Sequence, residues 1–288
     1  MRAAPRGLMR RRPIARTSVR DALDSAIIAL TAARCDTPRL DAELLLAAAM
    51  GVSRAMIVAR PDAELEPDEA WQFAEWVRRR RDREPVAYIL GSKGFRHIEL
   101  KVDRRVLIPR PETEHLVEAA LPLPEGARVV DVGTGSGAVA LALKHERPDL
   151  SVTGVDLSAD ALDVARANAT ALRLDVELLH GDLLEPVTGP IDAVVSNPPY
   201  VSADDRGSLA AEVTRHEPQV ALFAGPDGLA VYKRLVPAAA QAGARFIAVE
   251  IGSTQAVAVA ELLQRTGFSD VSVSQDLGGR DRIITGRR

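Results

Sequence analysis

The stretch "RVVDVGTGSGAVALALKH", Arg128–His145, decides the fold, because it joins an apolar strand to an apolar helix through a glycine-rich turn. The segments that follow repeat the pattern, with "SVTGVD" (151–156) as a strand and "ADALDVARANATAL" (159–172) as a helix. Strands that alternate with helices predict an open parallel sheet covered on both faces. The chain is therefore expected to be of the α/β class.

The same alternation continues toward the C-terminus. Further strands are expected at 176–180, 191–196 and 245–251, with helices at 229–242 and 254–266. The ending "VSVSQD…DRIIT" indicates two final strands that pair antiparallel. We assign residues 111–288 to this α/β domain.

Residues 18–85 predict a small α-helical domain. Apolar positions recur at helical spacing from Val19, a second helix fits Arg39–Met50, and a third begins at Pro67. The third helix ends in "RRRRDR", Arg78–Arg83, which is either a solvated last turn whose cations complement the helix C-terminus or a contact for an acidic partner or RNA. Residues 86–110, with the alternating "HIELKVDRRVLI", read as a β-hairpin connector between the domains.

Composition limits the classes of function. A net charge of −3 over 288 residues gives no general affinity for nucleic acid, and no apolar run approaches the roughly 20 residues needed to cross a bilayer. The single cysteine, Cys35, fits a reducing cytoplasm. The five histidines lack metal-ligand spacing, so no metal is expected. Residues 1–17 are rich in arginine and are expected to be a disordered basic tail, with a transit peptide or a nucleic-acid arm as alternatives.

The glycine-rich turn predicts a binding site for a ligand. Glycines allow a tight turn and let a ligand approach the backbone N–H groups at the start of the helix. The turn also satisfies the dinucleotide pattern G-x-G-x-x-G/A, and a turn that only packs helix on strand is the alternative. The candidate residues are Gly133, Thr134, Gly135, Ser136 and Gly137.

Acidic residues close the next two strands. Asp156 stands about 20 residues beyond the turn, where a carboxylate can accept hydrogen bonds from both ribose hydroxyls. Asp182 could accept from the amine of an adenine, with Leu183 against the ring. Each acid could instead cap the following helix. Together with the turn they favour an adenosine site, which both NAD and S-adenosylmethionine would fit.

The segment after the fourth strand separates these two cofactors. Asn197, Pro198, Pro199 and Tyr200 follow the apolar run at the edge where open α/β sheets bind ligands. The Asn197 side-chain carbonyl and the Pro198 backbone carbonyl can accept both N–H bonds of a planar –NH2 group and so orient its nitrogen for attack. Proline fixes φ and has no N–H, which holds the carbonyl rigidly. Tyr200 can stack on the flat group, and its ring favours a sulfonium cation. A hydride-transfer site gains nothing from this arrangement, so NAD is disfavoured.

The sequence resembles the release factor glutamine methyltransferases, the PrmC/HemK family, over about 270 residues. The segments that carry the resemblance are "REPVAYILGSKGF", "VLIPRPETEHLV", "VVDVGTGSGAVALAL", "VVSNPPYV", "RHEPQVALFAGPDGLAVYKRLV" and "DLGGRDRI". The resemblance implies a Rossmann-like methyltransferase sheet. It also implies methyl transfer from S-adenosylmethionine, leaving S-adenosylhomocysteine, to the side-chain N5 of the glutamine in the Gly-Gly-Gln motif of peptide chain release factors. We expect a cytoplasmic monomer that binds neither DNA nor membranes.

The resemblance also assigns residues to the site. Asn197–Tyr200 match the segment that holds the glutamine amide, and Phe95 matches an aromatic residue of the acceptor pocket. Arg110, Glu112 and Thr113 are expected near the active site or at the joint between the domains. Residues 216–217 match a segment expected to shape the loop over the acceptor, and residues 18–85 would bind the release factor.

Two alternatives remain open at this point. A DNA methyltransferase acting on the amino groups of adenine or cytosine shares the Asn-Pro-Pro-Tyr chemistry, but it would have to flip out its base and bind phosphates. The chain shows no basic target-recognition region after the α/β domain. A non-catalytic adaptor would keep the fold while losing the glycines or the asparagine, and both are present here.

Overall fold

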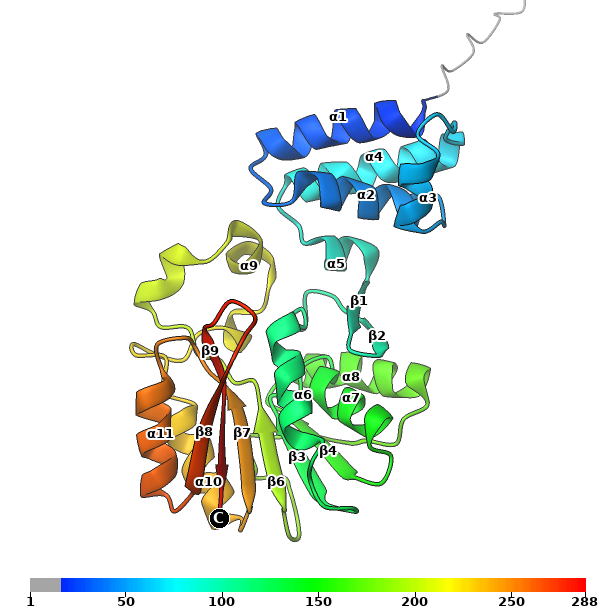
Figure 1. Ribbon diagram of the computed structural model, residues 1–288. Coiled ribbons are helices and arrows are strands. Elements are labelled where there is room, and N and C mark those ends of the chain that lie inside the picture. The colour runs from blue at the N-terminus through cyan, green and yellow to red at the C-terminus, as the bar shows by residue number, and fades with distance from the viewer. Residues whose placement is uncertain (1–16) are drawn as a thin grey trace, which may run out of the picture. The chain divides into compact units, whose positions relative to one another are not determined.

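The computed structural model describes residues 17–288, so nearly all of the expected basic tail lies outside the described residues. The described chain divides between Leu90 and Gly91 into two compact units. The first is helical, and the second holds a mixed sheet with helices on both faces (Figure 1).

The helical unit consists of α1 (Val19–Ala32), α2 (Pro38–Ala49), α3 (Arg54–Ala59), α4 (Pro67–Arg81) and α5 (Val86–Leu90). The Ser18 side chain caps α1 by accepting from Asp21 N at 3.1 Å, and Glu66 and Glu69 form a capping box at the start of α4. Its core is apolar and contains Leu30, Leu45, Leu46, Ile57 and Phe73.

Residues Val86–Leu90 were expected to begin the hairpin connector and instead form the short helix α5. Ile89 is buried in the core of the helical unit, and Val86 and Leu90 pack against that core. Spacings of three and four residues place such side chains on one helical face, whereas a strand would alternate them. The hairpin itself is confined to β1 (Ser92–Phe95) and β2 (Ile98–Lys101).

The arginine run at the end of α4 is not uniformly solvated, contrary to the simplest expectation. Arg80 is buried, with its Nε 2.7 Å from Asp41 Oδ2 of α2. Arg79 forms two hydrogen bonds of 2.8 Å with Glu84. A buried charge is tolerated only when it is paired, and the partner of Arg80 comes from a different helix.

The second unit is built on a seven-stranded sheet of order β5-β4-β3-β6-β7-β9-β8. The strands are β3 (Arg128–Val132), β4 (Ser151–Asp156), β5 (Glu177–His180), β6 (Ala193–Ser196), β7 (Phe246–Glu250), β8 (Ser269–Gln275) and β9 (Asp281–Arg287). The first five run parallel, and β9 pairs antiparallel with both β7 and β8. The predicted α/β class and the final antiparallel pair are confirmed.

Helices cover both faces of this sheet (Figure 1). On one face lie the turn η1 (Pro111–Thr113), α6 (Glu114–Ala120), α7 (Ala138–Glu146) and α8 (Ala159–Leu172), and on the other lie α10 (Tyr232–Gln241) and α11 (Ala256–Arg265). The short elements η2 (Asp204–Ser208), α9 (Ala211–His216) and η3 (Gln219–Ala221) connect β6 to α10. Side chains alternate between two cores, so Val129 packs in the first and Val130 in the second.

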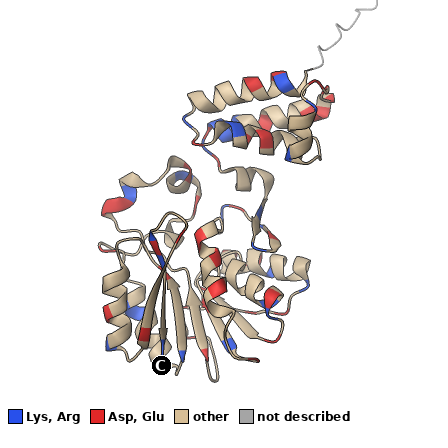
Figure 2. Ribbon diagram, viewed as in Figure 1, with Lys and Arg blue, Asp and Glu red and all other residues tan. Residues whose placement is uncertain are grey.

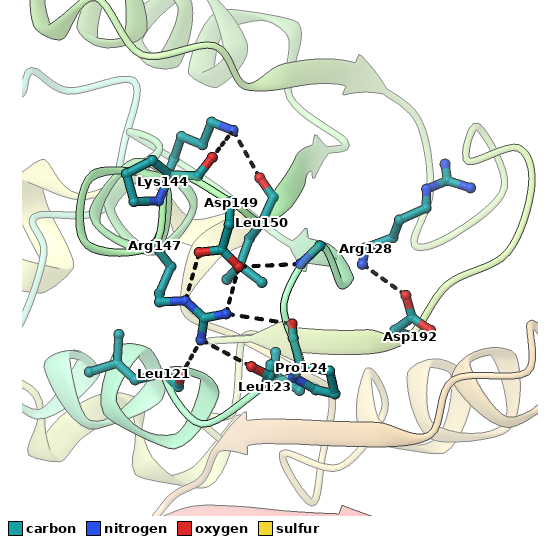
Figure 3. A network of polar contacts seen from close by, with 11 residues as sticks. Leu121, Leu123, Pro124, Arg128, Lys144, Arg147, Asp149, Leu150 and Asp192 are labelled. Atoms are coloured by element: carbon teal, nitrogen blue, oxygen red, sulfur yellow. Dashed lines mark hydrogen bonds and ion pairs between the residues drawn. The ribbon is translucent and has the colours of Figure 1, made fainter.

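A polar network fixes the amino ends of β3 and β4 (Figure 3). The Arg147 guanidinium donates to the carbonyls of Leu121, Leu123 and Pro124, and it also binds the Asp149 carboxylate. These bonds join the carbonyl groups of the segment that follows α6 to the C-terminal end of α7. They tie the segment after α6 to the segment between α7 and β4 at this edge of the sheet.

Charges of both signs are interspersed on the helices and loops, whereas the strands are mostly drawn in the colour of uncharged residues (Figure 2). Across residues 17–288 the structure contains no helix with the length and apolar character that a membrane span requires.

Candidate active site

A cavity of about 540 Å³ lies at the carboxyl ends of β3, β4, β5 and β6. The chain leaves β3 toward β4 and β5 on one side and returns to β6 on the other, so this edge contains the switch point where open α/β sheets bind ligands. Eight predicted site residues line the cavity: Gly133, Gly135, Asp156, Asp182, Leu183, Asn197, Pro198 and Pro199.

Within the glycine turn only Gly133 and Gly135 face this cavity. Gly135 has φ of 56°, and a methyl group added there would meet no protein atom within 4 Å, so the space in front of the turn is open to a ligand. Thr134 and Ser136 are buried behind the turn. Gly137 caps α7 with φ of 82°, and a Cβ there would lie 2.8 Å from Leu141 Cδ1, so backbone conformation and packing account for a glycine at this position.

Asp131 holds the turn from behind and was not singled out from the sequence. Its Oδ2 accepts from the Thr134 hydroxyl at 2.7 Å and from Ala140 N at 3.2 Å. Full burial raises its pKa to about 7, while these two hydrogen bonds act in the opposite direction. The signal available in the sequence was an acidic residue inside the apolar strand "RVVDV".

Asp156 closes β4 and supports the turn from the front. Its Oδ2 accepts from Gly135 N and its Oδ1 accepts from Ser158 N, both at 2.8 Å. Each carboxylate oxygen has a second lone pair, so the side chain can still accept two hydroxyl groups from a ligand in the cavity. Burial raises the pKa of Asp156, and the backbone hydrogen bonds partly offset this rise.

Asp182 and Leu183 lie where β5 leads into the cavity. The Asp182 carboxylate forms an ion pair with Arg234 of α10, which also lines the cavity. Leu183 adopts a positive φ of 51°, a conformation that is uncommon for a leucine. A contact of Asp182 with an adenine amine stays a prediction, since its carboxylate already has a partner.

Asn197 follows β6, and its two amide ends have different surroundings. Nδ2 donates to the Thr113 hydroxyl oxygen at 3.0 Å. Within residues 17–288, neither Asn197 Oδ1 nor the Pro198 carbonyl oxygen accepts a hydrogen bond. Every buried side-chain nitrogen or oxygen in that range has a hydrogen-bond partner. Because Asn197 Oδ1 has none among these residues, this oxygen must be accessible to solvent. Asn197 Oδ1 and the Pro198 carbonyl oxygen are therefore two unused acceptors, and both residues line the cavity.

Tyr200 and Phe95 are not among the residues that line the cavity. The Tyr200 hydroxyl donates to Glu250 Oε1 at 3.4 Å, and its backbone oxygen accepts from Gln255 Nε2 at 3.0 Å. The stacking role of Tyr200 therefore stays a prediction. Phe95 is 1% exposed and packs in the core on the α6–α8 side of the sheet, and its role in the acceptor pocket stays a prediction.

Arg110 and Glu112 are not among the residues that line the cavity, and their contact with the substrate stays a prediction. Arg110 Nη2 lies 2.5 Å from Glu217 Oε1, and Glu217 also accepts from Ile108 N at 3.4 Å. Burial raises the pKa of Glu217, whereas the charge of Arg110 lowers it. Glu217 precedes the cavity-lining residues Pro218, Val220, Ala221 and Phe223, so this ion pair ties the cavity wall to the segment before η1.

Among residues 17–288 no cluster of three or more histidine, cysteine or acidic side chains could hold a metal ion.

Glu250 was also missed by sequence reasoning. It closes β7, is 1% exposed, and accepts from the Thr113 hydroxyl at 2.6 Å. The available signal was a glutamate at the end of the apolar strand "FIAVE", because Asp156 likewise stands at the end of an apolar strand.

Comparisons with known proteins agree with this geometry. Residues 21–91 match the family model of the PrmC N-terminal domain, and residues 112–255 match the methyltransferase small domain. A release factor glutamine methyltransferase from Caulobacter vibrioides is 43% identical over 260 residues, covering 87% of this chain and 90% of that protein. One from Deinococcus radiodurans is 40% identical over 277 residues, covering 94% and 98%.

The fold is also found among solved structures. A methyltransferase from Pyrococcus furiosus superposes with a TM-score of 0.51 at 17% identity, covering 65% of this chain and 87% of that one. The sequence matches extend through both units of the chain and confirm the resemblance drawn from its motifs. The chain belongs to the release factor glutamine methyltransferase family.

Proposed function

We propose that this protein transfers a methyl group from S-adenosylmethionine to the side-chain N5 of the glutamine in the Gly-Gly-Gln motif of peptide chain release factors. The observation that carries the proposal is the pair of unused acceptors, Asn197 Oδ1 and the Pro198 carbonyl oxygen, at the end of β6. A carboxamide –NH2 group offers two N–H donors in one plane, which suits two fixed acceptors.

These acceptors act by positioning the nucleophile. The nitrogen of an amide is a poor nucleophile because its lone pair is delocalised into the carbonyl. Hydrogen bonds accepted from both N–H groups favour the charge distribution in which the nitrogen can attack, and they hold it in one orientation. Pro198 and Pro199 restrict the backbone, so the geometry exists before the substrate arrives.

The residues on the other side of the cavity suit S-adenosylmethionine. Gly133 and Gly135 leave room for a ligand against the turn, and Asp156 retains acceptor capacity for ribose hydroxyls. Leu183 offers an apolar surface to the adenine. When bound, the cofactor supplies an electrophilic methyl group on a sulfonium centre.

Selection of the release factor requires surface beyond the cavity, because glutamine side chains are present in most proteins. We assign this role to the helical domain, residues 18–85, and we expect the enzyme to act in the cytoplasm as a monomer. The exposed indole of Trp71 on α4, 69% exposed, is the residue of this domain that we expect to contribute most.

The experiment that tests the proposal is methylation of a purified release factor with methyl-labelled S-adenosylmethionine. We expect label in the factor, and none when the Gly-Gly-Gln glutamine is replaced or when Asn197→Ala is used. Plasmid DNA is assayed in parallel. Label in DNA and none in the factor would overturn the proposal in favour of the DNA methyltransferase, and no binding of S-adenosylmethionine by calorimetry would favour the adaptor.

A further inference from the structure

The Asn197 amide is one end of a chain of hydrogen bonds that leads away from the cavity into the protein. Asn197 Nδ2 lies 3.0 Å from Thr113 Oγ1, and Thr113 Oγ1 lies 2.6 Å from Glu250 Oε2. Thr113 and Glu250 are 4% and 1% exposed, so water does not compete for these bonds. Thr113 ends η1, Asn197 directly follows β6 and Glu250 ends β7, so these hydrogen bonds join three parts of the protein that are far apart in the sequence.

The number of protons available fixes the direction of these bonds. An ionised carboxylate can only accept, so the single hydroxyl proton of Thr113 must point to Glu250. Thr113 Oγ1 can then only accept from Asn197, and only the –NH2 end of an amide can donate. Oδ1 is thereby turned away from Thr113, which agrees with its accessibility and with the absence of a partner for it within residues 17–288.

We propose that Glu250 and Thr113 are positioning residues, which determine that Asn197 presents its oxygen, rather than its nitrogen, to the substrate amide. This inference rests on the proposed function, because only a substrate that donates N–H groups requires an acceptor at this point. Neither residue touches the reacting atoms, and both act through Asn197.

Protonation of Glu250 would permit the opposite direction. A protonated carboxyl can donate to Thr113 Oγ1, and the Thr113 hydroxyl can then donate to Asn197 Oδ1. Rotation of the amide would present Nδ2 to the cavity, where its N–H groups oppose those of the substrate. The ionised form of Glu250 is therefore the one that allows only the orientation with Oδ1 toward the cavity.

Several groups surround the Glu250 carboxyl. Burial raises its pKa to about 7, the hydrogen bond from Thr113 and the charge of Arg282 lower it, the charge of Glu112 raises it, and the Tyr200 hydroxyl lowers it. The Tyr232 hydroxyl donates to the Glu250 backbone oxygen at 2.7 Å, and not to the side-chain carboxyl. A change of protonation near neutral pH would thus remove the constraint that fixes the orientation of Asn197.

Steady-state kinetics of the full chain with a release factor test the proposal. Thr113→Val keeps the shape and removes the hydroxyl, and we expect kcat to fall on the order of tenfold to a hundredfold. KM for the factor and Kd for S-adenosylmethionine should stay within about threefold of wild type. Thr113→Ser restores the hydroxyl and should recover most of kcat. Thr153→Val is the matched control, because Thr153 is a buried threonine that also donates to a glutamate, Glu177, at 3.0 Å.

The pH profile distinguishes positioning from a merely structural role. Wild-type kcat should fall as the pH drops below about 7, the pKa of Glu250. Glu250→Gln removes the titrating group and lets either end of its own amide face Thr113. We expect this variant to have a lower kcat at pH 8 and to lack the acidic limb.

A measurement without the substrate keeps the two proposals separate. In 15N-labelled protein, the Asn197 side-chain amide signal, identified by its loss in Asn197→Ala, should shift with a midpoint near pH 7 in wild type and lose this titration in Thr113→Val. A wild-type enzyme that methylates no release factor overturns the proposed function, while the amide titration still decides the inference. Wild-type kcat in Thr113→Val, or an amide signal that does not move between pH 6 and 8, overturns the inference.

Discussion

Arg80 and Asp41 form an ion pair in the interior of the helical unit, with Arg80 Nε 2.7 Å from Asp41 Oδ2 and both side chains less than a tenth exposed. The pair joins the last turn of α4 to the first turn of α2. A buried pair of this kind contributes little compared with apolar packing, but removing one partner leaves an uncompensated charge in the core.

We therefore expect Asp41→Asn to lower the free energy of unfolding of the helical unit by about 3 kcal/mol. Both tryptophans of the chain, Trp71 and Trp76, lie on α4, so tryptophan fluorescence during urea unfolding reports on this unit. The matched control is Asp62→Asn, which breaks the exposed pair with Arg20 and should cost no more than about 1 kcal/mol. Equal losses in the two variants would contradict the prediction.

Asp156→Asn should weaken binding of S-adenosylmethionine by about tenfold to a hundredfold, because hydrogen bonds to a charged group contribute about 1.5–3 kcal/mol. The measurement is isothermal titration calorimetry. Asp182→Asn should have a smaller effect, since that carboxylate is already paired with Arg234.

The same site predicts a dependence of cofactor affinity on pH. Ribose hydroxyls donate to the ionised carboxylate of Asp156, whose pKa is raised by burial. Affinity should therefore decrease as the pH falls through this raised pKa, and Asp156→Asn should remove that decrease. Wild-type affinity that stays constant from pH 7 down to pH 4 would argue against ribose binding by Asp156.

Trp71→Ala should raise KM for the release factor on the order of tenfold or more, with kcat and the Kd of S-adenosylmethionine unchanged. Trp71 is a large exposed aromatic side chain on α4, and such residues carry much of the binding energy at protein interfaces. Val257→Ala, at an exposed apolar position on α11 of the other unit, is the control. An unchanged KM in Trp71→Ala would place the binding surface elsewhere.

The parts of the structure that follow from local patterns could be predicted from the sequence. The segments expected as strands at Arg128–Val132 and Ser151–Asp156, and the helix at Ala159–Leu172, coincide with β3, β4 and α8. Apolar runs, helical spacing and glycine turns depend only on residues that are neighbours in the sequence, so a short segment of the sequence is sufficient to recognise them.

The support of the site could not be predicted in this way. Thr113 is 84 residues from Asn197 and 137 residues from Glu250 along the chain, and no local pattern records that the three meet. The burial of Arg80 and of Phe95 has the same origin, because it depends on partners from distant elements. The short helices α5 and α9 were missed because five or six residues are too few to establish a period.

Glu250 provides a prediction about stability. Its pKa is about 7 in the folded protein, against an ordinary value of 4.5 that we expect in the unfolded chain. Because the folded-state pKa is raised, the unfolded chain ionises first, and wild type loses stability as the pH rises from about 4.5 to about 7. The loss can reach about 3 kcal/mol and levels off above the folded pKa.

Glutamine does not titrate, so the free energy of unfolding of Glu250→Gln minus that of wild type should increase over this pH window. The α/β unit contains no tryptophan. Its unfolding is therefore measured by circular dichroism, as the transition that is not accompanied by a change in tryptophan fluorescence. Taking the difference between the two proteins removes the contribution of every other titrating group that the substitution leaves unchanged. A difference that stays constant from pH 4.5 to 8 would mean that Glu250 does not change its charge there, and the acidic limb of kcat would then need another origin.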